Sequence, residues 1–454
     1  MADRTPEAGE GTSLLGGEDG GGRRSGSRSK VRVVLVALAT LAVVGIVSMV
    51  LVVPLTFRQG TPPDTIIADR LQQTNNYAAM ARRILHEVPL VDGHNDLAWR
   101  IKRAFDGQFS LFDLESDMRQ QLGDPHSCTD IPRIRQGMLG AQFWSAYTDC
   151  RSQYKDAVAH GLQAVDIIHR FVDTYSHVFQ LATSADDILA AKREGKVASL
   201  IGLEGGHMIA SRQDTLRMFY RLGVRYMTLT WNCNVPWADS NRPETDDVTL
   251  KHGGLTDWGK TLIVEMNRIG MMVDLSHVGA QTMRDALSVS RAPIIFSHSN
   301  ARALCPHARN VPDDVIKKVK HNGGIIMVNF YNGFINCTTQ NRYHGGEKRA
   351  SIDQLIDHME YIRRMIGVEH IGIGSDFDGS NQFPVELEDV SKYPNLIAGL
   401  LRRGWSEGDV KLVAGLNIMR VMRQVDQIRN EMRNMEPFDK PIDPVDVPVK
   451  SCLS

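Results

Sequence analysis

The chain has 454 residues, of which 42% are hydrophobic and 23% are charged, and its formal net charge at neutral pH is −1. This balance gives no electrostatic reason to expect a nucleic acid as a partner. The length allows two or three domains, or one α/β barrel of about 250 residues with insertions and flanking segments.

The N-terminal segment predicts a tail and a membrane span. Residues 1–29 are rich in Gly, Ser, Glu and Arg, have almost no large apolar side chains, and are expected to be disordered. The uncharged run Val33–Phe57 is mostly Val, Leu and Ala. At about 1.5 Å per residue, a helix of this length exceeds the roughly 30 Å hydrocarbon core of a bilayer. We therefore expect a cytosolic tail over 1–32 and a transmembrane segment over 33–57.

The charges around this span predict its orientation. Five basic residues lie between Arg23 and Arg32 and only Arg58 follows closely, so the positive-inside rule leaves the N-terminus in the cytosol. The long charged lead and the lack of a clear small-x-small cleavage site favour an uncleaved signal-anchor over a cleaved signal peptide. We expect a single-pass type II protein of the plasma membrane, with all later residues outside the cell. Within the tail, Glu10–Leu15 resembles an acidic dileucine endocytic sorting signal.

Cysteine usage agrees with this topology, because all six cysteines follow the span and would lie in the oxidising extracellular compartment. Their spacing leaves 15 pairings open. The sequon Asn336–Thr338 predicts N-glycosylation of Asn336 on the same side. Residues 58–81 predict a stalk, with a helical pattern leading into a folded domain over 82–430 and a C-terminal extension over 431–454. The cysteines are Cys128, Cys150, Cys233, Cys305, Cys337 and Cys452.

From Leu90 onward, eight short apolar runs alternate with longer stretches of helical periodicity. Continuous apolar strands separated by helices predict a parallel sheet covered on both faces. Eight such strands fit a closed (β/α)8 barrel of the TIM type, with a doubly wound open sheet as the alternative. The runs are Leu90–Val91, Gly140–Trp144, Val197–Leu203, Val224–Leu229, Gly270–Leu275, Pro293–Phe296, Gly324–Phe330 and Ile371–Gly374.

Metal-ligating residue types follow five of these runs. Side chains two apart on an extended strand point to the same side, so His94 and Asp96 can face one metal together. The carboxyl ends of barrel strands share one rim, where side chains from different runs are expected to converge. Imidazole nitrogen and carboxylate oxygen are both zinc ligands. The residues are His94, Asp96, Glu204, His277, His298 and Asp376.

This set predicts two metals rather than one. Three histidines and two or three carboxylates exceed the needs of one four-coordinate zinc with an open position. Two divalent ions about 3.5–4 Å apart, sharing one carboxylate and one water, would use them all and would activate that water for attack on an amide bond. Glu204, central in chain order, suits the shared position.

Five segments around these residues resemble the membrane dipeptidase (renal dipeptidase) family, zinc peptidases of the amidohydrolase-like barrel type. The resemblance runs from about Arg82 to about Gln424. It implies two Zn²⁺ ions, one held by His94, Asp96 and Glu204, and the other by Glu204, His277 and His298. The segments are Val91–Asp96, Gly202–His207, Asp274–His277, Phe296–Ser299 and Gly374–Gly379.

The resemblance also implies roles for residues around the metals. Asp376 is implied to handle protons at the scissile amide. Arg309 is implied to grip the C-terminal carboxylate of a dipeptide, a task that suits a guanidinium fork. His207 and Asp378 are expected to be structural, since the family counterpart of His207 is not a ligand.

The family further implies how the cysteines pair. By resemblance, Cys150 pairs with Cys233 and Cys305 pairs with Cys337. Cys452 lies roughly where the family has a cysteine that joins two subunits, so we expect a homodimer. Cys128 matches no family cysteine.

The chain departs from the family at two places. Where this chain has Trp231, the family has a histidine that contacts the substrate carbonyl and stabilises the tetrahedral oxyanion. Indole has one N–H donor and cannot carry a positive charge, and losing one such contact typically costs about 10²–10³ in rate. Several members also end in a hydrophobic tail that is exchanged for a lipid anchor. The segment Val447–Ser454 is not such a tail, so we expect anchoring by the N-terminal span instead.

Two hypotheses follow for the function. The first is a membrane-anchored extracellular zinc dipeptidase that hydrolyses the peptide bond of dipeptides. The second is a catalytically attenuated relative that binds zinc and acts as a surface binding or adhesion protein. The complete ligand set and Asp376 favour the first, and Trp231 favours the second.

Overall fold

The strands form one parallel sheet that closes on itself, in a computed structural model that describes residues 76–241, 252–337, 349–443 and 446–447. The strand order is β2-β1-β9-β8-β7-β6-β5-β4, and β2 also pairs with β4, which closes an eight-stranded barrel. A short ninth strand, β3, pairs with the start of β4 outside this ring. The strands are β1 (Leu90–Asn95), β2 (Leu139–Tyr147), β3 (Phe179–Leu181), β4 (Val197–Glu204), β5 (Val224–Thr228), β6 (Met272–Asp274), β7 (Ile295–Phe296), β8 (Ile325–Val328) and β9 (Ile371–Ile373).

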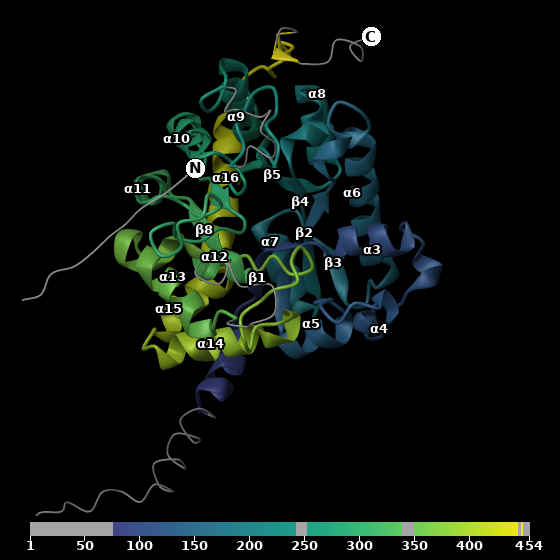
Figure 1. Ribbon diagram of the computed structural model, residues 1–454, viewed down its shortest axis with the longest axis vertical. Helices are drawn as coiled ribbons and strands as arrows, with labels where there is room; N and C mark the ends of the chain where they lie inside the picture. Colours follow the sequence, from purple (N-terminus) through teal and green to yellow (C-terminus); the bar gives the residue numbers. More distant parts are fainter. Residues whose placement is uncertain (1–75, 242–251, 338–348, 444–445, 448–454) are drawn as a thin grey trace, which may run out of the picture. The chain divides into compact units, whose positions relative to one another are not determined.

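Helices connect the strands and surround the barrel (Figure 1). An unlabelled helix over 76–87 leads into β1, as the apolar pattern predicts. The longer helices are α3 (Leu97–Phe105), α6 (Ala157–Thr174), α7 (Ala185–Arg193), α8 (Gln213–Arg221), α9 (Asp257–Ile269), α10 (Ala280–Val289), α11 (Asp313–Asn322), α13 (Ile352–Ile366), α14 (Tyr393–Arg402) and α16 (Asn417–Glu431). The shorter ones are α4 (Met118–Leu122), α5 (Ile131–Gly137), α12 (Asn332–Ile335) and α15 (Glu407–Lys411).

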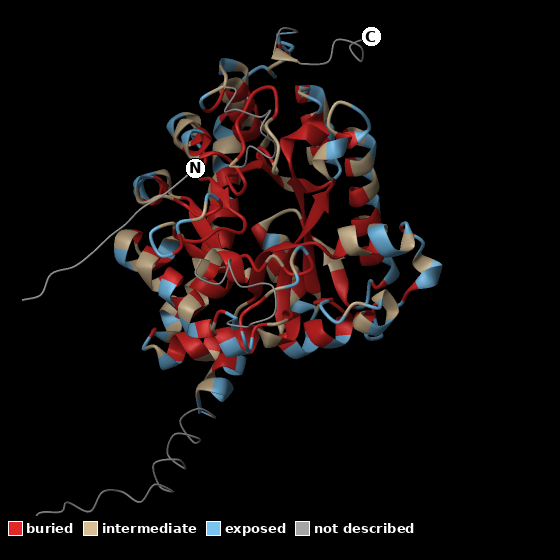
Figure 2. Ribbon diagram, in the orientation of Figure 1, coloured by how far each residue is buried: buried red, intermediate tan, exposed pale blue. Residues whose placement is uncertain are grey.

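Burial explains why the strands read as unpatterned apolar runs. Every residue of β1, β2 and β4 is buried, because barrel strands face the interior on one side and helices on the other. Figure 2 shows the strands buried, while exposed positions lie on the outer faces of the helices. The helices are amphipathic for the same reason, and α13 buries residues such as Leu355, Met359 and Ile362.

The barrel prediction is confirmed, and each of the eight apolar runs overlaps one strand of the barrel. The alternative, a doubly wound open sheet, is wrong because the pairing of β2 with β4 leaves no gap in the ring. Strand β3 was not predicted, since three residues carry too little periodicity to be recognised.

Among the described residues, none of the helices has the length and apolar character needed to cross a bilayer. The predicted tail, the predicted span Val33–Phe57, most of the stalk and Cys452 lie outside the described residues.

Candidate metal centre

The predicted ligands lie at one end of the barrel because the strands are parallel. His94 belongs to the end of β1 and Asp96 follows that strand, while Glu204 is the last residue of β4. His277, His298 and Asp376 lie two or three residues beyond β6, β7 and β9. Asp96 is not extended, having φ −100° and ψ 24°, yet its Oδ2 still lies 3.3 Å from His94 Nε2.

Three histidine Nε2 atoms converge on the two oxygens of Glu204. His94 Nε2 lies 3.3 Å from Oε2, whereas His277 and His298 Nε2 lie 3.1 and 3.8 Å from Oε1. Glu204 is 4% exposed and accepts a hydrogen bond from Ser145 at 2.9 Å. The two oxygens of Glu204 thus face different imidazole nitrogens, while the rings of His94 and His298 lie close together, with centroids 3.9 Å apart.

The donor atoms fit a divalent cation. His94 Nε2 is buried and makes no hydrogen bond, and the Nε2 atoms of His277 and His298 are only 3.0 Å apart. Burial and the nearby Arg309 lower the pKa of His277 to about 3, and burial with His94 and Arg309 lowers the pKa of His298 well below its usual value. Both imidazoles are therefore neutral, and buried neutral nitrogens beside a carboxylate are the donor set that zinc prefers.

Two overlapping sets of residues place their ligand atoms within 4.8 Å of one another. One set is His94, Glu204 and His298, and the other is His94, Asp96 and Asp376. The first set combines His94 and His298, which the resemblance assigns to different ions. The second set includes Asp376, for which a proton-transfer role was expected. Both sets share His94, whose Nε2 lies 3.3 Å from a carboxylate oxygen of Asp96 and 3.3 Å from one of Glu204.

The carboxylates of this cluster attract positive charge. Burial raises the pKa of Asp376 to about 7, and Asp96 and Glu204 act in the same direction. Burial alone would lower the pKa of His94, but Tyr226, Glu204 and Asp96 raise it well above its usual value. The carboxyl pKa of Glu204 is held well below normal by His94 and His277, against the effect of burial. The electrostatics thus favour a cation among these side chains.

A second layer of residues, which the sequence reasoning missed, holds the imidazoles at Nδ1. Asn232 Oδ1 lies 3.0 Å from His277 Nδ1, the Tyr226 hydroxyl 2.9 Å from His94 Nδ1, and the Ser297 hydroxyl 2.7 Å from His298 Nδ1. Because each Nδ1 faces an oxygen, each Nε2 is the nitrogen presented to the cluster. Of these three residues, only Ser297 had a signal in the sequence, since a serine directly precedes His277, His298 and Asp376.

A cavity of about 470 Å³ opens onto the cluster. Most of the predicted site residues line it, and His94 and His298 lie behind it, at most 1% exposed. Aromatic rings form much of the remaining wall, from Trp99, Tyr147, Tyr331 and Phe334. The predicted residues on its wall are Asp96, Glu204, Trp231, His277, Arg309 and Asp376.

Arg309 lies at one side of this cavity and is 3% exposed. It donates hydrogen bonds to the Ser299 hydroxyl and the His298 carbonyl, both at 3.3 Å, and its guanidinium lies 5.2 Å from the centre of the Phe334 ring. These contacts hold the buried guanidinium of Arg309 at the cavity wall, a position that suits recognition of a substrate carboxylate.

Trp231 lies at the other candidate substrate position, half-buried in the cavity wall. Its ring contacts Tyr147, with centroids 4.9 Å apart, and its centroid is 6.0 Å from that of His277. At the position where the resemblance implies a histidine, this chain has an indole packed into an aromatic wall.

His207 and Asp378 are not on the wall of this cavity. His207 donates from Nε2 to the Thr148 carbonyl at 3.1 Å, and burial lowers its pKa to about 4. Asp378 accepts a hydrogen bond from the backbone of Cys128 at 2.9 Å, and burial raises its pKa. Both residues thus brace the loops around the rim, in line with the structural roles expected of them.

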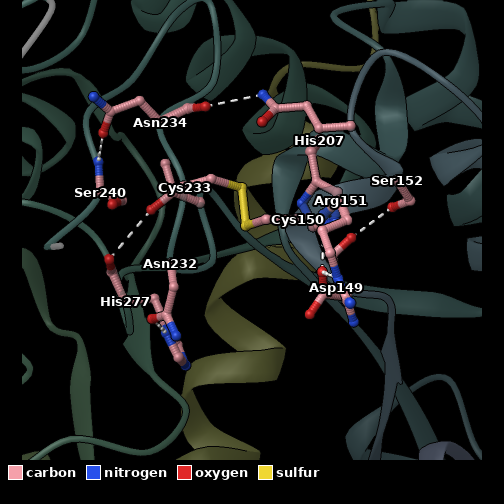
Figure 3. Close-up of a disulfide and its surroundings, with 12 residues drawn as sticks. Asp149, Cys150, Arg151, Ser152, His207, Asn232, Cys233, Asn234, Ser240 and His277 are labelled. Atoms are coloured by element: carbon pink, nitrogen blue, oxygen red, sulfur yellow. Dashed lines mark hydrogen bonds and ion pairs between the residues drawn. A yellow bond between two sulfur atoms is a disulfide. The ribbon is translucent and has the colours of Figure 1, made fainter. Parts of the chain in front are cut away.

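The structure contains the two disulfides that the resemblance implies, Cys150–Cys233 and Cys305–Cys337. The first joins the segments that follow β2 and β5, and Figure 3 shows Asn232, next to Cys233, directed at His277. Cys128 is a buried free thiol. Asn336 lies at the end of α12, beside the second bridge.

The closed barrel and the cluster at its carboxyl rim define a barrel protein with a candidate metal centre. Residues 78–436 match the family described as "Membrane dipeptidase (Peptidase family M19)", and the chain belongs to this family. It is 43% identical over 359 residues to "Dipeptidase 3" of Rattus norvegicus, a match that covers 79% of this chain and 70% of that protein.

Solved structures show the same fold. The probable dipeptidase PvdM from Pseudomonas aeruginosa matches with a TM-score of 0.69 and 21% identity, over 78% of this chain and 99% of that one. A metallopeptidase from Rhodobacter sphaeroides, solved with a phosphinate mimic of the dipeptide L-Ala-D-Ala, matches with a TM-score of 0.65 and 23% identity. That match covers 74% of this chain and 99% of the other.

Proposed function

We propose that this protein is a zinc dipeptidase with two metal ions. The observation that carries the proposal is the convergence of three imidazole Nε2 atoms on the two oxygens of Glu204. His94, Asp96 and Glu204 Oε2 would hold one ion, and Glu204 Oε1, His277 and His298 the other; we call these the first and second metal positions. When bound, the two ions would supply an activated water and polarise the peptide carbonyl.

The residues around the metal positions divide the remaining tasks. Arg309 binds the C-terminal carboxylate of the dipeptide, since it is a buried cation on the cavity wall. Asp376 Oδ2 accepts a hydrogen bond from Asn329 at 2.9 Å, so Oδ1 is the atom that takes up a proton and passes it to the leaving amine. A metallopeptidase of the same fold was solved with a dipeptide mimic, which supports dipeptides as the substrate class.

Trp231 supports a second candidate, an attenuated relative acting as a surface binding or adhesion protein. Its indole lines the cavity where the resemblance places an oxyanion-stabilising histidine. Metals would bind as in the first candidate, and turnover would be weak or restricted to other dipeptides.

The cellular setting is also part of the proposal. The apolar run Val33–Phe57 would anchor the chain as a type II plasma membrane protein, with the barrel outside the cell. An extracellular location fits the two disulfides and the sequon at Asn336. Cys452 would link two copies into a homodimer.

The test is steady-state hydrolysis of a dipeptide panel by the purified full chain, with metal content measured on the same sample. Turnover that disappears with a chelator and returns with zinc is expected. The Arg309→Lys variant should raise KM at least about tenfold with little change in kcat, because a bidentate contact is lost. A dipeptide amide, which has no carboxylate, should not distinguish the two proteins. Two bound zinc ions with negligible turnover would favour the second candidate, and no bound metal would overturn both.

A further inference from the structure

A buried carboxylate that binds no metal in this scheme connects three neighbouring strands behind the second metal position. Asp274, the last residue of β6, is fully buried. Its Oδ1 accepts hydrogen bonds from the backbone N–H of Ser276 at 3.0 Å and of Ser297 at 2.9 Å. Its Oδ2 accepts from the hydroxyls of Thr228 and Ser297, each at 2.6 Å. Thr228 ends β5 and Ser297 follows β7, so one side chain fixes the ends of three strands.

These hydrogen bonds hold the two serines that directly precede the histidines of the second metal position. Ser276 directly precedes His277, and Ser297 directly precedes His298. His277 has a φ of +67°, which a residue with a side chain adopts only when its surroundings enforce it. The bond from the Ser276 N–H to Asp274 is therefore one of the contacts that hold His277 in this conformation.

The Ser297 hydroxyl links Asp274 to the ring of His298. Its oxygen lies 2.6 Å from Asp274 Oδ2 and 2.7 Å from His298 Nδ1, and it has one hydrogen to donate. The charged carboxylate is the better acceptor, so the hydroxyl donates to Asp274 and accepts from Nδ1–H. His298 then presents an unprotonated Nε2 to Glu204, as a metal ligand must.

The hydrogen-bond chains from the other two histidines end on neutral groups, whereas the chain from His298 reaches Asp274 through the Ser297 hydroxyl. His277 Nδ1 faces the amide oxygen of Asn232. His94 Nδ1 faces the Tyr226 hydroxyl, which donates to the Gly93 carbonyl at 3.1 Å. Among the three histidines, only His298 has a chain of hydrogen bonds that ends on a carboxylate. A carboxylate at that end makes the imidazole a more basic ligand.

We infer that Asp274, acting through Ser297, is a positioning residue that gives the second metal position its affinity and makes it retain its metal longer than the first. This inference rests on the proposed two-metal function, and it adds which position is the tighter and which residues outside the ligand set make it so. A hydroxyl relay to a buried carboxylate is the feature that distinguishes the two positions.

The experiment compares zinc release from the full chain and from Ser297→Ala, using a chelating dye, with total zinc measured on each sample. We expect two release phases from the wild type. In Ser297→Ala the slower phase should accelerate, and the affinity of one zinc equivalent should fall about 10–100-fold, while the faster phase keeps its rate. Ser297→Thr, which keeps the hydroxyl, should restore the wild-type rates.

Thr228→Val is the matched control, because it removes the other hydroxyl on Asp274 Oδ2 without touching a histidine. It should leave both phases unchanged, and circular dichroism checks that each variant is folded. Equal release from wild type and Ser297→Ala would overturn the inference alone, as would an equal loss in Thr228→Val. A wild type that binds no zinc would overturn the proposed function, and the inference with it.

Discussion

Replacing Trp231 by histidine should increase dipeptide hydrolysis and slightly lower stability. The indole now packs against Tyr147, with centroids 4.9 Å apart, and an aromatic pair of this kind contributes about 0.5–1.5 kcal/mol. Imidazole is smaller and loses most of this contact. It gains a group that can hold positive charge beside the reacting carbonyl, and restoring one such contact is expected to raise kcat/KM about 10²–10³-fold, or about 3–4 kcal/mol in activation free energy.

The assay is kcat/KM on a dipeptide panel for wild type, Trp231→His and Trp231→Phe, with zinc content and urea unfolding measured on the same preparations. Phenylalanine keeps an aromatic ring but offers no donor, so it separates the effect of lost bulk from that of the imidazole. We expect less than about a tenfold gain for phenylalanine. If histidine and tryptophan enzymes turn over every dipeptide equally, with equal zinc content, the assignment of Trp231 to the oxyanion position is refuted.

Three further predictions follow from the geometry. Gly379→Ala should abolish activity without unfolding the chain, because its added Cβ would collide with the carboxylates of Asp96 and Asp376; activity and circular dichroism together check this. His207 stays neutral in the fold with a pKa of about 4, whereas the unfolded chain binds a proton near pH 6.5. Stability should therefore fall by about 2 kcal/mol between pH 7 and pH 5, and urea unfolding of His207→Gln should lack this part of the decrease. The Cys150–Cys233 and Cys305–Cys337 bridges close loops of 83 and 32 residues. The chain-entropy model gives losses of about 4.6 and 3.7 kcal/mol for their paired serine variants, so equal unfolding free energies for the two would contradict it.

The sequence predicted the barrel and the ligand types because both depend on local patterns. Apolar runs such as Val197–Leu203 and the polar residue that ends each run can be read along the chain, and parallel topology brings those ends together. What could not be read is which distant residues touch. Tyr226 contacts His94 across 132 residues, and Asn232 contacts His277 across 45, so neither spacing carries a local signal.

The strained positions of the rim show how the fold holds residues of the candidate site. His277 and Asp376 both have φ near +65°, at +67° and +65°, which costs about 1–3 kcal/mol each for a residue with a side chain. Each follows a serine whose backbone N–H donates to a buried aspartate, Ser276 to Asp274 at 3.0 Å and Ser375 to Asp92 at 2.7 Å.

Hydrogen bonds to a charged group contribute about 1.5–3 kcal/mol, which is enough to offset strain of this size. The pattern Asp-x-Ser-His in Asp274–His277 therefore encodes a clamp, and Asp92 with Ser375 forms the same clamp from residues 283 apart. Asp92 also accepts hydrogen bonds from the hydroxyls of Ser375 at 2.6 Å and Tyr393 at 2.7 Å, as Asp274 does from Ser297 and Thr228. Two equivalent carboxylates thus hold opposite sides of the rim, one behind the proposed second metal position and one behind Asp376.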